Sequence, residues 1–132
     1  MGPSSRYDAD RGGRRVLIVG DNPQVRRELR TLLPLAGNIE ITGEAADGLE
    51  AIHLLQTLEP EVVLIDLEMP ILDGYEATRQ IKAYRPLCRV VALTVYADRE
   101  SRDRATGAGV DAFLVKGGSV ESLVQAICES EA

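Results

Sequence analysis

Long hydrophobic runs are absent from this sequence of 132 residues, and histidine and cysteine are scarce. No apolar run approaches the length of a membrane span and none resembles a secretory signal, so we expect a soluble, cytoplasmic protein without membrane contact. The two cysteines, Cys88 and Cys128, form no Cys-x-x-Cys motif, and we expect both to be reduced thiols. The only histidine, His53, is expected at the surface or boundary of a helix rather than as a phosphodonor.

Positively charged residues are also fewer than negatively charged ones. The sequence has 15 Lys and Arg residues against 21 Asp and Glu residues, which gives a formal net charge of −6. An acidic surface repels phosphate backbones, which disfavours direct nucleic-acid binding by this domain. No Gly-x-Gly-x-x-Gly motif follows the first apolar run, which disfavours a dinucleotide site.

The length indicates one domain. We predict a disordered leader over residues 1–13, which are polar and Gly-rich, and a folded domain over residues 14–132.

Short apolar runs rich in β-branched residues alternate with segments whose apolar residues fall at helical spacing. The predicted strands cover residues 15–20, 38–45, 61–66, 89–94 and 111–116. The predicted helices cover residues 23–35, a segment reaching about residue 58, a segment opened by Gly74, residues 99–108, and a last segment capped by Ser119. This alternation is typical of parallel strands joined by right-handed crossovers, with helices on both faces. The sequence therefore predicts a doubly wound α/β fold.

Polar residues stand where four of the predicted strands end. The first strand ends in Gly20 and Asp21, the third in Asp66, the fourth in Thr94 and the fifth in Lys116. In an open parallel sheet, ligands bind beyond the carboxyl ends of the strands, so these side chains are expected to converge. Two neighbouring carboxylates repel each other, and Mg²⁺ relieves that repulsion while keeping oxygen ligands. A carboxylate beside a cation can also attack phosphorus and form an aspartyl phosphate.

Four separated motifs in this order, "VLIVGDNP", "VVLIDLEMPILDG", "VVALT" and "FLVKGGS", resemble the receiver domain of a two-component response regulator. The resemblance implies a flavodoxin-like (βα)5 fold with strand order 2-1-3-4-5. The stretch "GEAADGLEAI" and the Lys-Gly-Gly-Ser ending resemble the subfamily that carries a LuxR-type helix-turn-helix output domain.

This resemblance also assigns roles to individual residues. It implies that Asp66 is the phosphoacceptor. It also implies that Asp21, Asp66 and the backbone carbonyl of Glu68 are the protein ligands of Mg²⁺. Thr94 is expected to hydrogen-bond the phosphoryl group, and Lys116 to pair with it.

The resemblance further places Phe113 at the position of a switch aromatic, which turns inward when Thr94 moves toward the phosphate. The implied donor is a sensor histidine kinase. The implied result is a changed surface that controls dimerisation or an output domain for transcription. Such a domain is not an enzyme beyond self-catalysed phosphotransfer and dephosphorylation.

The sequence departs from the family pattern at two positions. Gly20 stands where the family usually has an acid, so we expect weaker Mg²⁺ binding, and we hypothesise that the Glu68 side chain partly replaces the missing carboxylate. Gly117 follows Lys116 where the family usually has proline, so we expect a trans bond there. Tyr96 lies where the family tunes phosphate lifetime, and its ring could shield the acyl phosphate.

Three other interpretations stay open at this point. Gly20 favours a pseudo-receiver, a protein-binding module that is never phosphorylated. The Asp66 and Glu68 pair at i, i+2 is also the spacing of aspartate-dependent phosphatases and mutases, although the short chain offers no obvious substrate cap. Taken singly, each of the site residues could be a turn, cap or solvated strand-end residue.

Asp73 is expected only to cap a helix. The thin apolar face of residues 99–108 fits either a weakly packed helix or a mobile signalling surface.

Overall fold

The computed structural model describes residues 13–129, so the predicted leader lies outside the described residues except for Gly13. The described residues form one five-stranded sheet in the order β2-β1-β3-β4-β5, and every neighbouring pair is parallel. The strands are β1 (Arg14–Val19), β2 (Ile39–Ala45), β3 (Val62–Asp66), β4 (Arg89–Thr94) and β5 (Ala112–Val115). The predicted fold class and strand order are confirmed.

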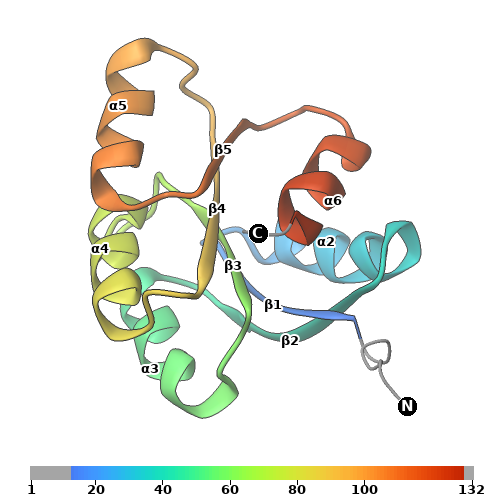
Figure 1. The fold of residues 1–132 in the computed structure, drawn as a ribbon. Coiled ribbons are helices and arrows are strands. Elements are labelled where there is room, and N and C mark those ends of the chain that lie inside the picture. The colour runs from blue at the N-terminus through green and yellow to red at the C-terminus, as the bar shows by residue number, and fades with distance from the viewer. Residues whose placement is uncertain (1–12, 130–132) are drawn as a thin grey trace.

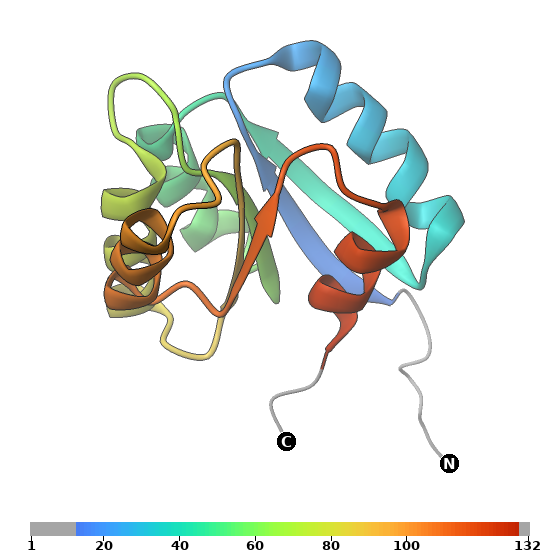
Figure 2. The same cartoon turned by 90° about the horizontal axis from the view of Figure 1, so that it is seen from above.

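Each strand leads into a helix that crosses back over the sheet. The helices are α2 (Pro23–Ala36), α3 (Gly48–Leu58), α4 (Gly74–Tyr84), α5 (Arg99–Ala108) and α6 (Val120–Cys128). Helices α3, α4 and α5 cover one face of the sheet, and α2 and α6 cover the other (Figures 1 and 2). The carboxyl ends of the strands therefore meet at one edge, between the two layers of helices.

Side-chain caps start the helices where the sequence predicts them. Asn22, Asp73, Asp98 and Ser119 each accept hydrogen bonds from backbone N–H groups two or three residues further along. These bonds satisfy donors that the first turn of a helix leaves free, and they set where each helix begins after its strand. The caps thereby limit the length of the loops that carry the polar strand ends.

The three inner strands, β1, β3 and β4, are buried on both faces, as their continuous apolar runs predict. Along β1, Leu17 and Val19 pack into a cluster with α3, α4 and α5, whereas Val16 and Ile18 pack into a second cluster with α2 and α6. The first cluster contains fully buried aliphatic residues from the helices: Ala51, Leu55, Ala77, Ile81 and Ala105. Residues from α2 and α6 close the second: Leu33, Leu123, Ala126 and Ile127.

Helix α2 forms where the sequence predicts it, but most of its apolar side chains are not buried. Only Leu33 is buried within this helix, while Val25 is 43% exposed and Leu32 is 45% exposed. Helix α6 lies beside α2 on the same face of the sheet (Figure 1). An open cavity of about 730 Å³ lies between the two helices and is lined by apolar residues such as Leu29 and Leu123. Leu49 in α3 and Tyr84 in α4 are also exposed.

Both cysteines are free thiols, as predicted, with Cys88 buried and Cys128 exposed. Burial raises the pKa of the Cys88 thiol to about 11, so this group stays protonated near neutral pH. His53 is exposed, in agreement with its expected surface position. Among the residues that the structure describes, no helix has the length and hydrophobicity required to cross a membrane.

Gly74 fixes the approach of α4 to the end of β3. A Cβ atom at this position would lie 2.6 Å from the Asp66 carbonyl oxygen and 2.6 Å from the Leu67 Cα. Because both are backbone atoms, Gly74→Ala is expected to push α4 away and to lower the free energy of unfolding by about 1–3 kcal/mol. Chemical denaturation followed by circular dichroism measures this change.

Gly107→Ala is the matched control. Gly107 lies in α5, and a Cβ atom built on it would have no neighbouring side chain or other element within 4 Å. This substitution is expected to raise the free energy of unfolding by about 0.5 kcal/mol, since alanine loses less backbone freedom on folding. Equal effects of the two substitutions would show that the close approach at Gly74 is not a constraint.

Candidate functional site

An ion pair between Asp66 and Lys116 lies at the centre of the carboxyl edge. Asp66 is the last residue of β3, and Lys116 directly follows β5. The Lys116 Nζ atom is 2.7 Å from the Asp66 Oδ2 atom. Since β4 lies between these two strands, the lysine side chain spans the end of β4 to reach the carboxylate. The predicted convergence of these two residues is present in the structure.

The other oxygen of Asp66 is also engaged. Its Oδ1 atom accepts a hydrogen bond from the Glu68 backbone N–H at 3.0 Å. This local bond and the lysine contact together hold the carboxylate in one orientation at the strand end. The side chain of Asp66 is only 12% exposed, so approach to its oxygens is restricted.

Thr94 lies at the end of the adjacent strand, but its hydroxyl bonds elsewhere. The buried Thr94 donates from Oγ1 to Glu68 Oε2 at 2.6 Å and accepts from the Tyr96 backbone N–H at 3.1 Å. The second oxygen of Glu68 accepts from the Val95 backbone N–H at 3.3 Å. The Glu68 carboxylate, expected as a substitute near the metal, therefore binds the loop that follows β4.

Asp21 completes the set of predicted residues at this edge. It lies on the loop between β1 and α2 and lines the same cavity as Asp66 and Lys116. Its side chain is exposed and makes no hydrogen bond or ion pair within residues 13–129. The preceding residue, Gly20, is adjacent to Asp66, since a Cβ built on it would lie 3.7 Å from the Asp66 Cβ.

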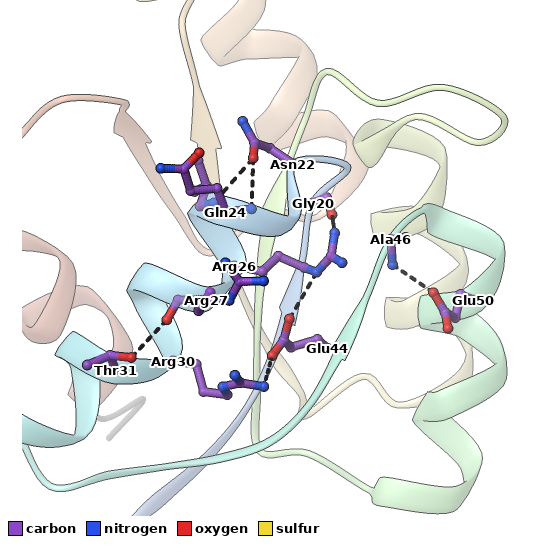
Figure 3. Close-up of polar contacts among 11 residues, drawn as sticks. Gly20, Asn22, Gln24, Arg26, Arg27, Arg30, Thr31, Glu44, Ala46 and Glu50 are labelled. Carbon is purple, nitrogen blue, oxygen red and sulfur yellow. Dashed lines mark hydrogen bonds and ion pairs between the residues drawn. The ribbon is translucent and has the colours of Figure 1, made fainter.

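An arginine network beside Gly20 was not predicted from the sequence. Arg26 donates from one terminal nitrogen to the Gly20 carbonyl at 2.5 Å and from Nε to Glu44 Oε1 at 3.0 Å (Figure 3). Arg30, one turn further along α2, donates to Glu44 Oε2 at 2.6 Å. The sequence contains a signal for this network, because Arg26 and Arg30 stand at i, i+4 on one helix face and Glu44 is the next-to-last residue of β2, the strand beside β1.

The remaining predicted residues lie around the edge of the site. Phe113 is half-buried on β5, and the Arg102 guanidinium of α5 lies 4.6 Å from the centre of its ring. Tyr96 is 55% exposed on the loop after β4. Gly117 has a positive φ of 90°, and the described backbone contains no cis peptide bond, so the bond after Lys116 is trans as expected.

The donor set fits a hard divalent cation in its chemistry. Asp21 and Asp66 offer carboxylate oxygens to one cavity, and the Glu68 backbone carbonyl belongs to the loop beside them. Oxygen donors of this kind suit Mg²⁺, which takes one or two carboxylates and keeps several waters. Within residues 13–129 no three His, Cys, Asp or Glu side chains are grouped to hold an ion, so a cation here would depend on two carboxylates, a carbonyl and water.

The sequence and the fold agree with those of known proteins. The model of the response regulator receiver domain family matches residues 16–128, and the chain belongs to that family. Members of this family are signalling domains rather than classical enzymes, and sensor histidine kinases phosphorylate them.

Curated relatives include two regulators from bacteria. Transcriptional regulatory protein PdtaR of Mycobacterium tuberculosis is 40% identical over 126 residues, which cover 96% of this chain and 60% of the relative. Response regulator protein VraR of Staphylococcus aureus is 38% identical over 113 residues, which cover 86% of this chain and 54% of the relative. The chain thus spans little more than half the length of these relatives.

Solved structures show the same architecture. A LuxR-family two-component response regulator from Aurantimonas sp. SI85-9A1 superposes with a TM-score of 0.82 at 32% identity, covering 87% of this chain and 82% of that one. The receiver domain of the NarL response regulator of Mycobacterium tuberculosis gives 0.81 at 29% identity, covering 87% and 93% of the two chains. The predicted resemblance to receivers with LuxR-type relatives is confirmed.

Restoring an acid at position 20 is expected to strengthen binding of Mg²⁺. The 3.7 Å spacing from the Asp66 Cβ is an ordinary van der Waals contact, so a side chain fits there. Gly20→Asp should raise Mg²⁺ affinity about tenfold, because a unit charge near the ion contributes on the order of 1–4 kcal/mol near a protein surface. Titration followed by nuclear magnetic resonance of the amides near Asp66 measures this affinity.

Gly20→Asn supplies a side chain of similar size without the charge and is expected to leave the Mg²⁺ affinity close to that of the parent. An unchanged affinity in Gly20→Asp would contradict the view that the glycine weakens the metal site.

Proposed function

We propose that this chain is the phosphoacceptor domain of a two-component system and that Asp66 accepts a phosphoryl group from a sensor histidine kinase. The observation that carries the proposal is the 2.7 Å contact between the Lys116 ammonium and the Asp66 carboxylate at the carboxyl edge of the sheet. An ammonium in that place can pair with an oxygen of a phosphoryl group attached to Asp66. Membership in the receiver family supports the same assignment.

Asp66 and the residues around it are proposed to have different roles in phosphotransfer. The Asp66 carboxylate is the nucleophile, and the Glu68 N–H orients it through Oδ1. Lys116 is the cation that balances negative charge on the transferred group. Thr94 ends the neighbouring strand and can supply a hydroxyl donor to the phosphoryl oxygen once it is released from Glu68.

Asp21, Asp66 and the Glu68 carbonyl would hold Mg²⁺, which, when bound, neutralises charge on the transferred phosphoryl group. The acidic side chains bring the site the negative charge that a divalent cation requires. With Gly20 in place of an acid, fewer carboxylates share this task, and we expect the metal site to be weaker than one with an acid pair.

Phosphorylation is proposed to change the surface around β4, α5 and β5. Helix α5 buries only Ala105 and Ala108, which agrees with its thin apolar face and makes it a good candidate for a mobile element. Phe113 lies beneath α5 in contact with Arg102, so a movement of Thr94 could be passed to this aromatic ring. The altered surface would control dimerisation or a transcriptional output domain, in keeping with the names of the regulators that the chain resembles.

A second candidate function is a protein-binding module that is never phosphorylated. Two observations favour it: Gly20 removes an acid from the edge, and the Thr94 hydroxyl is bound to Glu68. The intact Asp66 and Lys116 pair argues for the first function. The two functions differ in whether Asp66 reacts with a phosphodonor.

Acetyl phosphate with Mg²⁺ should add one phosphoryl group to the protein at Asp66. The physical reason is that the oriented carboxylate and the Lys116 cation already form the receiving site. Intact-mass spectrometry measures the addition, and treatment with hydroxylamine, which cleaves acyl phosphates, should remove it.

Asp66→Asn is the first control and should show no added mass, while Asp73→Asn, which changes an acid that caps α4, should still be phosphorylated. If the parent protein gains no mass under conditions that phosphorylate an established receiver, the binding-module function is the better one.

A further inference from the structure

Glu68 ties together the two loops that flank the acceptor. Its carboxylate accepts one hydrogen bond from the Thr94 hydroxyl at 2.6 Å and one from the Val95 backbone N–H at 3.3 Å. We refer to these two bonds as the Glu68 clasp. Glu68 belongs to the loop after β3, whereas Thr94 and Val95 belong to the end of β4 and the loop that follows it. The clasp therefore joins segments that the chain separates by more than twenty residues.

The clasp occupies the donor that phosphotransfer is expected to need. A threonine hydroxyl carries a single hydrogen, and in this structure that hydrogen is directed to Glu68 Oε2. The same oxygen atom of Thr94 accepts from the Tyr96 N–H at 3.1 Å, which fixes the loop after β4 from the other side. Thr94 cannot donate to a phosphoryl oxygen while the clasp is closed.

We propose that Glu68 is a positioning residue that holds Thr94 away from the phosphoryl group, so that the Glu68 clasp must open before the phosphorylated state forms. This inference rests on the proposed function, because it assumes that a phosphoryl group arrives at Asp66. It assigns Glu68 a role opposite to that of a substitute metal ligand. Glu68 opposes the active state through its bond to Thr94.

The contacts of Glu68 favour this role. A hydroxyl-to-carboxylate bond of 2.6 Å lies in the range of strong, charge-assisted hydrogen bonds. Neither oxygen of the carboxylate contacts a lysine or arginine within residues 13–129, because the Lys116 ammonium is bound to Asp66. A phosphoryl group on Asp66 would bring further negative charge near this carboxylate, so it would both repel Glu68 and compete with it for Thr94.

The clasp predicts a measurable reduction of apparent affinity for a phosphoryl mimic. When the binding-competent conformation is only a fraction of the population, the apparent dissociation constant rises by the inverse of that fraction. Opening the clasp by substitution removes this penalty. Beryllofluoride, which occupies the phosphoryl position on an acceptor aspartate, is the probe, and its affinity in the presence of saturating Mg²⁺ is the readout.

Glu68→Ala is expected to bind beryllofluoride about tenfold more tightly than the parent, a change within the range for one hydrogen bond to a charged group. Glu68→Gln should lie between the two, because its amide oxygen still accepts from Thr94 without the charge. The Val95 amide proton should shift in Glu68→Ala, since that amide loses an acceptor. Glu76→Gln is the matched control: it removes a nearby acid that contacts Arg79 rather than Thr94, and it should leave the affinity unchanged.

A double-mutant cycle separates action through Thr94 from direct charge repulsion. In a Thr94→Val background, which lacks the hydroxyl, the gain from Glu68→Ala should disappear. If the gain persists in that background, Glu68 acts on the phosphoryl group by its charge alone, and the clasp proposal is overturned. An equal beryllofluoride affinity in the parent and Glu68→Ala also overturns it, as does an unmoved Val95 amide.

Mg²⁺ titration of the same variants, without beryllofluoride, tests the competing role of Glu68. Under the clasp proposal, Glu68→Ala keeps a Mg²⁺ affinity within about twofold of the parent, since its backbone carbonyl is retained. A marked loss would show instead that the carboxylate serves the metal. If no variant binds beryllofluoride and none gains mass from acetyl phosphate, the proposed function itself has failed, and the clasp fails with it.

Discussion

The ion pair between Lys116 and Asp66 is the contact on which the arrangement at the carboxyl edge depends. It joins the ends of β3 and β5 across the end of β4, with 2.7 Å between nitrogen and oxygen. A carboxylate that is only 12% exposed would be costly without such a partner, because burial disfavours a lone charge. The pair thus allows an acid to end the central strand, and it places an ammonium beside the carboxylate that is proposed to accept the phosphoryl group.

Gly20 and Glu68 both affect how charge is distributed around that pair. Gly20 stands next to Asp66 where the family usually has an acid, and its backbone carbonyl accepts from the Arg26 guanidinium, which also pairs with Glu44. On the other side, Glu68 turns its carboxylate to Thr94 rather than toward Asp21. Both changes reduce the negative charge that is available to a cation, and the second also binds the hydroxyl donor. The proposed site therefore has its Asp66 and Lys116 pair in place, whereas the Thr94 hydroxyl is bound to Glu68 and an expected acid is absent at Gly20.

Much of the fold could be predicted because its local signals are strong and agree with one another. The apolar runs of β1 and β3 pack on both faces, and Asn22 and Ser119 cap helices where their sequence position indicates. The apolar spacing of α2 predicted the helix but not its burial, since Val25 lines an open cavity and is 43% exposed. Periodicity shows which side of a helix is apolar, but it does not show whether a neighbouring element is long enough to cover that side.

The sequence by itself determined the order of strands and helices, the side chains that end each strand, and hence the meeting of Asp66 and Lys116. These follow from periodicity and from the parallel topology, which brings every strand end to one edge. Only the tertiary structure decided which partner each polar atom takes: Glu68 binds Thr94, and Arg26 approaches Gly20. Such choices depend on distances and orientations of a few ångströms between loops far apart in the chain, and no local pattern of residues carries that information.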